Sequence, residues 1–287
     1  MKKRNSFVIA GIILILAAAI LLFVFFPTSS KTVQTENFSL TEKVYLSDQD
    51  TTLGSLNIDL NIDLPISYHD QNILDKIKTI IRTELFGDVF ISFPEDSLLN
   101  YYAIELGREY IDNNADFAKK ISDDSRLAFN NSIVLEGFAL LNDENIFSYG
   151  ISRFVDFGGA HPIKTRLFYN FNLKDGKVIF EDDIFTAGYQ TELTEIIKNK
   201  LLQDNNQHEE TPNLESLDNS VYFSDEIKPN GNFYINDESI CFVFNPYEIA
   251  PYYIGETEVV LPYKLIHHLM KPDNPLEYLV TAALNNN

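Results

Sequence analysis

The sequence predicts an α+β protein with antiparallel sheets and packed helices in two abutting subdomains, plus one N-terminal transmembrane helix. Three observations lead to this prediction. An uninterrupted apolar run occupies residues 7–26, several later segments alternate apolar and polar residues like strands, and amphipathic helical patterns lie between groups of strands. Because helices and hairpins are segregated along the chain, a parallel βαβ fold fits poorly.

The apolar run is long enough to cross a bilayer. Residues 7–26 carry no charge and correspond to about 30 Å of helix, and a basic cluster at residues 2–4 precedes them. The cluster predicts that residues 1–6 form a cytoplasmic stub and that the chain after Pro27 is extracytoplasmic, so the protein is expected in the bacterial cytoplasmic membrane as a single-pass protein. A cleaved signal peptide is the alternative, but its apolar region is usually shorter. No cysteine follows the run, which excludes a lipoprotein anchor.

The first elements after the membrane run are well marked. Residues 27–36 are small and polar and are expected to form a linker. The stretch LNIDLNIDL at residues 56–64 alternates strictly, which predicts a half-buried strand. Isoleucines and leucines at helical spacing predict a helix over residues 73–85, which Asp70 or Asn72 caps and Gly87 ends.

The same two periodicities predict the later elements. They are a helix over residues 98–117, strands at 132–141, 146–157, 165–173 and 177–180, a helix over 188–203, strands at 232–235, 239–244 and 258–263, and a short helix at 265–270. We therefore expect a first domain at residues 37–150, a C-terminal domain at 151–271 and a tail at 272–287.

The charge and cysteine content restrict the classes of partner. Three of the 22 basic residues precede the membrane run, so 19 basic and 42 acidic residues follow it, a formal charge of −23. Such a surface repels nucleic acid, so no nucleic-acid partner is expected. The charge serves solubility or, alternatively, captures a cationic protein. The single cysteine, Cys241, has apolar neighbours and is expected to be a buried thiol without a disulfide.

A Gly-Gly pair and a histidine interrupt the strand patterns in FVDFGGAHPIK. Gly158 and Gly159 predict a tight turn or bulge that requires positive φ. His161 is interpreted as a structural loop histidine, with metal binding or proton transfer as the alternative. The other four histidines have none of the spacings typical of a metal site, and adjacent His267 and His268 make a poor chelate. No metal site is predicted.

Two motifs resemble the RsiV-like family of extracytoplasmic domains. They are GGAHPIKTRLFYNFNLKDGKVIFEDDIF at residues 158–185 and ICFVFNPYEIAPYYIGETEVVLPYKLI at residues 240–266. The resemblance covers residues 154–270, and residues 53–141 are similar to the partner domain that usually precedes it. Phe157 and Pro162 stand where the family often has tyrosine and glycine.

The resemblance implies a domain of unknown function that binds a partner. One family member is an anti-sigma factor whose outer domain binds lysozyme, and a paired domain accompanies a polysaccharide deacetylase in cell-wall enzymes. The short stub at residues 1–6 leaves no room for a sigma-factor-binding domain, so no sigma factor is expected as a partner. The motif positions that we take as candidate ligand-binding residues are Gly158, Gly159, Ala160, His161, Asn245, Pro246, Tyr247, Glu248, Pro251 and Tyr252.

No catalytic signature accompanies these motifs. GxSxG, GxxxxGK, GxGxxG and cysteine clusters are absent from the sequence, so no catalytic residue and no cofactor is predicted. The stretch NPYEIAPYYIG is a rigid connection between strands or, alternatively, an aromatic contact surface. The leading hypothesis is a membrane-anchored binding module for lysozyme or another cell-envelope ligand. The alternatives are an enzyme or accessory acting on peptidoglycan, for which Asp156, His161 and Glu248 would be tested first, and a structural envelope protein.

Overall fold

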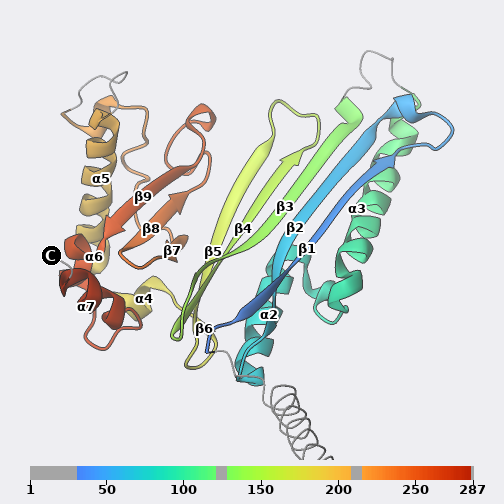
Figure 1. Cartoon of the computed structure of the whole chain (residues 1–287). Helices are drawn as coiled ribbons and strands as arrows, with labels where there is room; N and C mark the ends of the chain where they lie inside the picture. Colours follow the sequence, from blue (N-terminus) through green and yellow to red (C-terminus); the bar gives the residue numbers. More distant parts are fainter. Residues whose placement is uncertain (1–30, 121–127, 208–214, 286–287) are drawn as a thin grey trace, which may run out of the picture.

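The computed structural model describes residues 31–120, 128–207 and 215–285, which form two units side by side (Figure 1). The N-terminal unit is a six-stranded sheet with two long helices on one face, and the C-terminal unit is a three-stranded sheet flanked by helices. The α+β class is therefore confirmed. The predicted membrane span at residues 7–26 lies outside the described residues, and within them no helix combines the length and apolar character needed to cross a bilayer.

The elements follow one another along the chain without large insertions. The strands are β1 Gln34–Tyr45, β2 Ser55–Ser67, β3 Asn130–Asn142, β4 Ile146–Asp156, β5 Ile163–Asn172, β6 Lys177–Val178, β7 Phe233–Ile235, β8 Ser239–Phe244 and β9 Thr257–Pro262. The α-helices are α2 Gln71–Phe86, α3 Glu95–Ala118, α4 Glu181–Ile184, α5 Tyr189–Gln207, α6 Tyr263–Ile266 and α7 Glu277–Asn285. Short 3-10 turns are η1 Thr51–Leu53, η2 Asp88–Phe90, η4 Leu217–Asn219, η5 Tyr252–Ile254 and η6 His267–Leu269.

The six-stranded sheet is mixed rather than purely antiparallel. Its strands run in the order β1-β2-β3-β4-β5-β6, and β2 and β3 are parallel, with Ile58 opposite Ile133. The other neighbouring pairs are antiparallel. The prediction of antiparallel sheets is wrong at this one pair. The connection from β2 to β3 contains α2 and α3, and a long helical connection is what parallel pairing requires.

The predicted linker at residues 27–36 ends too late, because β1 begins at Gln34 and Val33 is already buried. β1 pairs with β2 along its whole length and forms the edge of the sheet. Its apolar residues Phe38, Leu40 and Val44 are only partly buried. An edge strand of this kind gives a weak alternation, which is why the sequence pattern did not reveal it.

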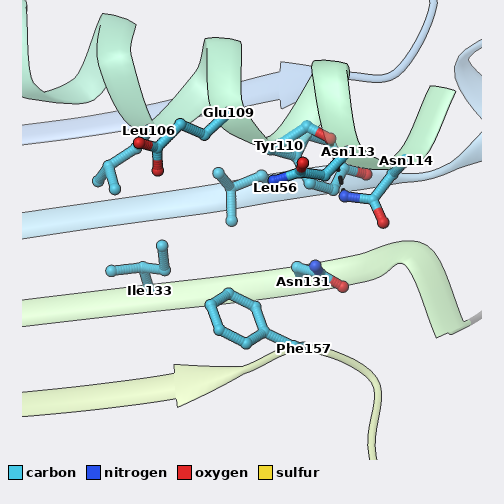
Figure 2. A pocket seen from close by; sticks show the side chains of 9 residues that line it. All are labelled: Leu56, Leu106, Glu109, Tyr110, Asn113, Asn114, Asn131, Ile133 and Phe157. Carbon is cyan, nitrogen blue, oxygen red and sulfur yellow. Dashed lines mark hydrogen bonds between the residues drawn. The ribbon is translucent and has the colours of Figure 1, made fainter.

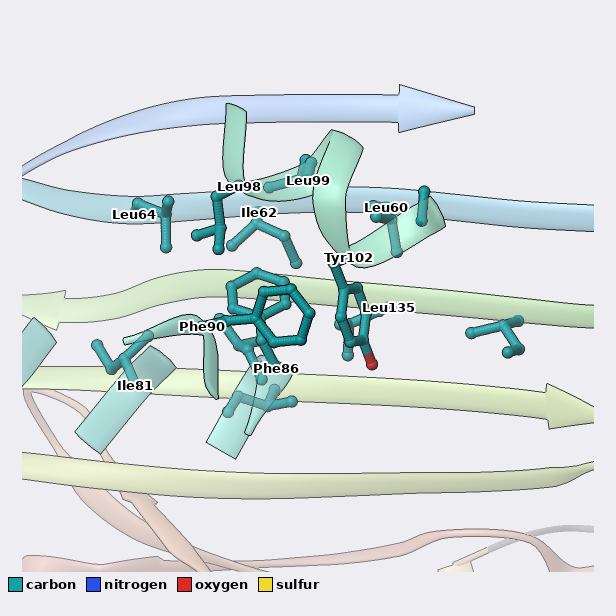
Figure 3. Packing of buried hydrophobic residues seen from close by; sticks show 14 of the residues in the cluster. Leu60, Ile62, Leu64, Ile81, Phe86, Phe90, Leu98, Leu99, Tyr102 and Leu135 are labelled. Carbon is teal, nitrogen blue, oxygen red and sulfur yellow. The ribbon is translucent and has the colours of Figure 1, made fainter. Parts of the chain in front are cut away.

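The first core lies between the sheet and the two helices (Figure 3). The alternating apolar residues of β2, such as Ile58, Leu60 and Ile62, all face this core, as the sequence predicted. Helix α2 begins where Asp70 Oδ1 accepts hydrogen bonds from the backbone of Asn72 and Ile73, so Asp70 is the N-cap. The strict period-two and period-3.6 patterns therefore specified this layer correctly.

A buried arginine joins the two long helices. Arg82 of α2 donates from Nη1 to the carbonyl oxygens of Ile91 and Phe93, at 2.8 and 2.7 Å, and from Nη2 to Glu95 Oε1 at 2.6 Å. Lys78 donates to the same carboxylate oxygen. The hydrogen bond from Lys78, together with the nearby charges, lowers the pKa of Glu95 below its usual value of 4.5. The start of α3 is thus fixed to α2 by charge-assisted hydrogen bonds.

Tyr149 of β4 gives a first testable prediction. Its side chain is fully buried over Gly137, and its hydroxyl has no hydrogen-bond partner in the described part of the chain. An unsatisfied buried polar group costs about 1–3 kcal/mol, so Tyr149→Phe is expected to raise the free energy of unfolding by about 1 kcal/mol. Urea denaturation followed by circular dichroism measures this change. A loss of more than about 1 kcal/mol would contradict the assignment of an unpaired hydroxyl.

The C-terminal unit has its own core around the antiparallel strands β7, β8 and β9. All six residues of β8 are buried, including the free Cys241, whose pKa is raised chiefly by burial. The prediction of a buried thiol is confirmed. The segment predicted as a tail at residues 272–287 contains helix α7, and Leu276 and Leu279 within this segment belong to the core. This helix has nine residues and is too short to show a clear helical period.

The two units do not divide at the predicted position. The proposed boundary between residues 150 and 151 falls inside β4, and the six-stranded sheet continues through β6 to Val178. The second core starts mainly from Ile179 onward, although Ile146 of β4 also belongs to it. Hairpin β3–β4 and strand β5 look like one continuing block of strands in the sequence, so composition did not mark the true change of sheet.

Three asparagines connect the sheets, and we call Asn170, Asn232 and Asn245 the asparagine seam. Asn170 is 2% exposed, and its side chain accepts from the backbone N–H of Ile235 and donates to the carbonyl of Phe233, both in β7. The seam residues of the C-terminal unit bind the open edge of β5. Along this edge of β5, side-chain amides therefore take the place of the backbone hydrogen bonds of a neighbouring strand, because each amide carries both a donor and an acceptor.

Candidate functional site

Each of the two sequence motifs contributes a loop, and the two loops lie next to each other at one end of the asparagine seam. The first loop, residues 157–162, connects β4 to β5, and the second loop, residues 245–256, connects β8 to β9. Asn245 fixes their separation, because its Oδ1 accepts from Arg166 N at 2.7 Å and its Nδ2 donates to Arg166 O at 3.1 Å. Loops from different sheets are thus held next to each other by the edge of β5.

The Gly-Gly pair makes the turn of the first loop, and its two glycines have different roles. Gly158 has φ of +69°, and a Cβ there would collide with the carbonyl of Ala128. Asp156 Oδ1 accepts from Gly158 N at 2.9 Å and stabilises the turn. Gly159 has no atom within 4 Å of where a Cβ would lie, and like Ala160 it is exposed. The need for glycine with positive φ is therefore confirmed at Gly158.

His161 lies between two tyrosines of the second loop, and we call His161, Tyr247 and Tyr252 the aromatic cluster. The rings of His161 and Tyr252 stack with centroids 3.7 Å apart and planes at 19°. His161 Nδ1 is 3.0 Å from Pro162 O and Nε2 is 2.9 Å from Tyr247 Oη. Since a carbonyl only accepts, Nδ1 carries the proton, and in the neutral ring Nε2 accepts the tyrosine proton. Both ring nitrogens are thus hydrogen-bonded, and the contact of Nε2 with Tyr247 joins the first loop to the second.

The second loop holds Tyr247 in a strained conformation. Tyr247 has φ of +74°, a region in which bulky residues are rare, and its side chain is 58% exposed. A turn around it is closed by a hydrogen bond from Glu248 N to Asn245 O, and the Glu248 carboxylate accepts from the side chains of Asn245 and Asn230. Strain of this kind costs about 1–3 kcal/mol, and the surrounding contacts maintain it.

Prolines shape the rest of the second loop. Pro246 lies directly before Tyr247, and Pro251 precedes the 3-10 turn η5 with φ of −59°. Tyr252 begins this turn, and its hydroxyl donates to Pro162 O at 2.7 Å. The adjacent Tyr253 is 72% exposed. The segment is therefore a rigid connection that also presents tyrosine rings to solvent, and its use as a contact surface stays a prediction.

Residues that the motifs did not include also contribute to the site. Arg166 of β5 forms an ion pair with Glu256 at 2.6 Å and lies over the rings of Phe138 and Phe168. Glu258 is 3.8 Å from the same guanidinium group. The pairing joins residues 90 positions apart, and a single sequence carries no signal for such a contact. This arginine neutralises part of the negative charge below the loops.

A hollow borders the first loop on the side of the sheet that carries the helices. Its volume is about 310 Å³, and its lining includes Val155, Phe157, Ile163 and the ring of His161. Phe157 and Ile163 are exposed. An apolar hollow beside exposed tyrosines is a surface suited to contact with another molecule.

The three residues named for the enzymatic alternative each have partners other than one another. Asp156, His161 and Glu248 each bind a loop partner, and within the described ranges no hydrogen bond joins any two of them. The same part of the chain contains no group of three or more His, Cys, Asp or Glu residues that could hold a metal ion. The acidic run at residues 181–183 forms the first turn of α4, where Asp183 accepts from Phe180 N.

Comparison with known proteins connects the C-terminal unit to a family. A family described as Protein of unknown function (DUF3298) matches residues 182–264. The DUF3298 segment contains the whole second loop. No curated protein matches the chain. The first loop, at residues 157–162, lies before residue 182, so the family match includes the second loop but not the first.

Two crystal structures share the fold of both units. A member of the DUF3298 family from Bacteroides fragilis NCTC 9343 has a TM-score of 0.77 and 24% identity over 87% of this chain and 98% of its own. A DUF3298 family protein from Pseudomonas aeruginosa PAO1 has a TM-score of 0.53 and 16% identity over 85% of this chain and 97% of its own. The N-terminal unit therefore accompanies the DUF3298 segment in these structures too.

Proposed function

We propose that this protein is a binding module anchored in the bacterial cytoplasmic membrane by residues 7–26, with both units extracytoplasmic. Its two loops recognise lysozyme or another cationic cell-envelope ligand, and its role is not catalytic. The apolar run, the preceding basic cluster and the resemblance of both loops to the RsiV-like family support this proposal.

The single observation that carries the proposal is the conformation of Tyr247. The protein holds a bulky, exposed ring at positive φ and fixes it with a hydrogen bond to His161 of the first loop. Such strain is typical of positions kept for binding, and tyrosine is favoured at the centre of protein interfaces. The stacked rings of the aromatic cluster make the surface rigid, which lowers the entropy lost on binding.

The charge of the chain determines the class of partner. The 42 acidic residues of the sequence all follow residue 26, and a net negative surface attracts a basic protein and speeds its association. Arg166, which lies below the loops, is paired with Glu256. We therefore expect attraction of a cationic partner that weakens as salt screens the charges.

The test is binding of lysozyme to the full-length protein in lipid nanodiscs, measured by interferometry at low and physiological salt. We expect a sub-micromolar Kd that weakens with salt, and about tenfold weaker binding for Tyr247→Asn, since asparagine tolerates positive φ but lacks the ring. The matched control is Tyr101→Asn, an exposed tyrosine on α3 away from the loops. No binding at about 100 μM, or equal effects of both variants, would contradict the proposal.

A further inference from the structure

The N-terminal unit contains a second cavity, on the side of the sheet that carries the helices. Its volume is about 250 Å³, and Figure 2 shows how three elements enclose it. Leu106, Glu109 and Asn113 of α3 lie on one side, Leu56 of β2 and the start of β3 lie opposite, and Phe157 of the first loop lies beside the start of β3. None of these residues belongs to the aromatic cluster.

An unsatisfied amide lies in this cavity. Asn131 of β3 is 6% exposed and is one of the lining residues. Its Oδ1 is buried and has no hydrogen-bond partner among the residues that the structure describes. Leaving such an acceptor unpaired costs about 1–3 kcal/mol, which a donor supplied by a ligand would recover. A buried acceptor without a partner in a native structure calls for an explanation. A ligand that donates to Asn131 Oδ1 would supply one.

The rest of the lining offers polar groups and apolar contacts but no positive charge. Asn113, Asn114 and the carboxylate of Glu109 offer further hydrogen-bonding groups, with Asn114 Nδ2 already donating to Tyr110 O at 2.7 Å. Leu56 and the phenyl ring of Phe157 provide apolar contacts. None of the nine lining residues carries a positive charge, so an anion would be unpaired in the cavity.

We propose that this cavity binds a single neutral pyranose ring. Sugar hydroxyls donate to and accept from carboxamides and carboxylates, and one donates to Asn131 Oδ1. The C–H face of the ring packs on Phe157 and the neighbouring aliphatic side chains, as expected for a site that combines apolar walls with a few polar groups. Pockets for larger ligands enclose about 300–1,000 Å³, so the smaller cavity is suited to one ring.

The experiment is saturation-transfer NMR with the full-length protein in lipid nanodiscs and three probes: glucose, N-acetylglucosamine and glucose 6-phosphate. We expect saturable transfer to at least one neutral sugar with a Kd of about 1–10 mM, and at least tenfold weaker binding of the phosphate. Asn131→Leu is expected to weaken binding at least tenfold.

The matched control is Asn130→Leu, because the preceding residue of β3 is exposed and lies on the opposite face of the strand. It should leave sugar binding unchanged. Phe157→Ala, at an exposed position, provides a second variant that should weaken binding without loss of stability. Absence of transfer to both neutral sugars at about 50 mM, or equal transfer in wild type and Asn131→Leu, would overturn the proposal, as would equal binding of the phosphate. Tyr247→Asn should not affect sugar binding, because Tyr247 does not line this cavity. Failure of the sugar-binding proposal can therefore be distinguished from failure of the lysozyme-binding proposal.

Discussion

Replacing Asn170 with leucine is expected to lower the free energy of unfolding by about 4 kcal/mol. The side chain accepts from Ser148 Oγ at 2.7 Å and Ile235 N at 3.2 Å, and donates to Phe233 O at 2.7 Å. Leucine has a similar volume but leaves all three groups buried and without these partners. Each unpaired group costs about 1–3 kcal/mol, so this one position of the asparagine seam outweighs most single contacts.

Urea denaturation followed by circular dichroism measures the loss. The control is Asn37→Leu, because Asn37 also makes two side-chain hydrogen bonds, to Asn61 and Asp63, but on the exposed face of the sheet. Water replaces those bonds, so the control should change the free energy by less than about 1 kcal/mol. Equal losses in the two variants would show that the seam contributes no more than surface contacts.

Alanine at Gly158 is expected to lower the free energy of unfolding by about 3 kcal/mol and to displace the first loop. The positive φ is unfavourable for alanine, and the added methyl group collides with the carbonyl of Ala128. Because the turn leads directly to His161, its displacement also separates His161 from Tyr252. We therefore expect weaker lysozyme binding together with lower stability.

The neighbouring glycine supplies the comparison. Gly159→Ala adds the same methyl group one residue later, where nothing lies within 4 Å, and should change the free energy of unfolding by less than about 0.5 kcal/mol. Denaturation curves of the two variants, recorded under identical conditions, measure the difference. If both alanines are tolerated equally, the loop does not depend on the turn at Gly158.

Elements with a strong period were predictable from the sequence. The strand at residues 56–64 and the helix ending at Gly87 follow directly from alternation, helical spacing and capping chemistry. Edge strand β1 and helix α7 were missed, because the first is only half-buried and the second is short. Sequence periodicity arises from the buried residues on one face of an element, so an element that buries few residues shows little periodicity.

For the candidate site, the sequence indicated the two loops but not their chemistry. Asn245 was included as a motif residue, and the structure assigns it a role in holding β5 to the second loop. The ion pair of Arg166 with Glu256 and the unpaired amide of Asn131 were not foreseen. Both depend on residues far apart in the chain meeting in three dimensions, which neither spacing nor composition encodes.

The asparagine seam also has a consequence during biosynthesis. The first core draws on residues 33–173, whereas the groups that cover the edge of β5 come from Asn232 and Asn245. A chain synthesised from its N-terminus completes the first core before these side chains exist. In that interval the N–H groups of Arg166 and Phe168 face outward, where another nascent chain can pair with them. The edge of β5 is therefore most open to pairing with other chains between the synthesis of residue 173 and that of residue 245.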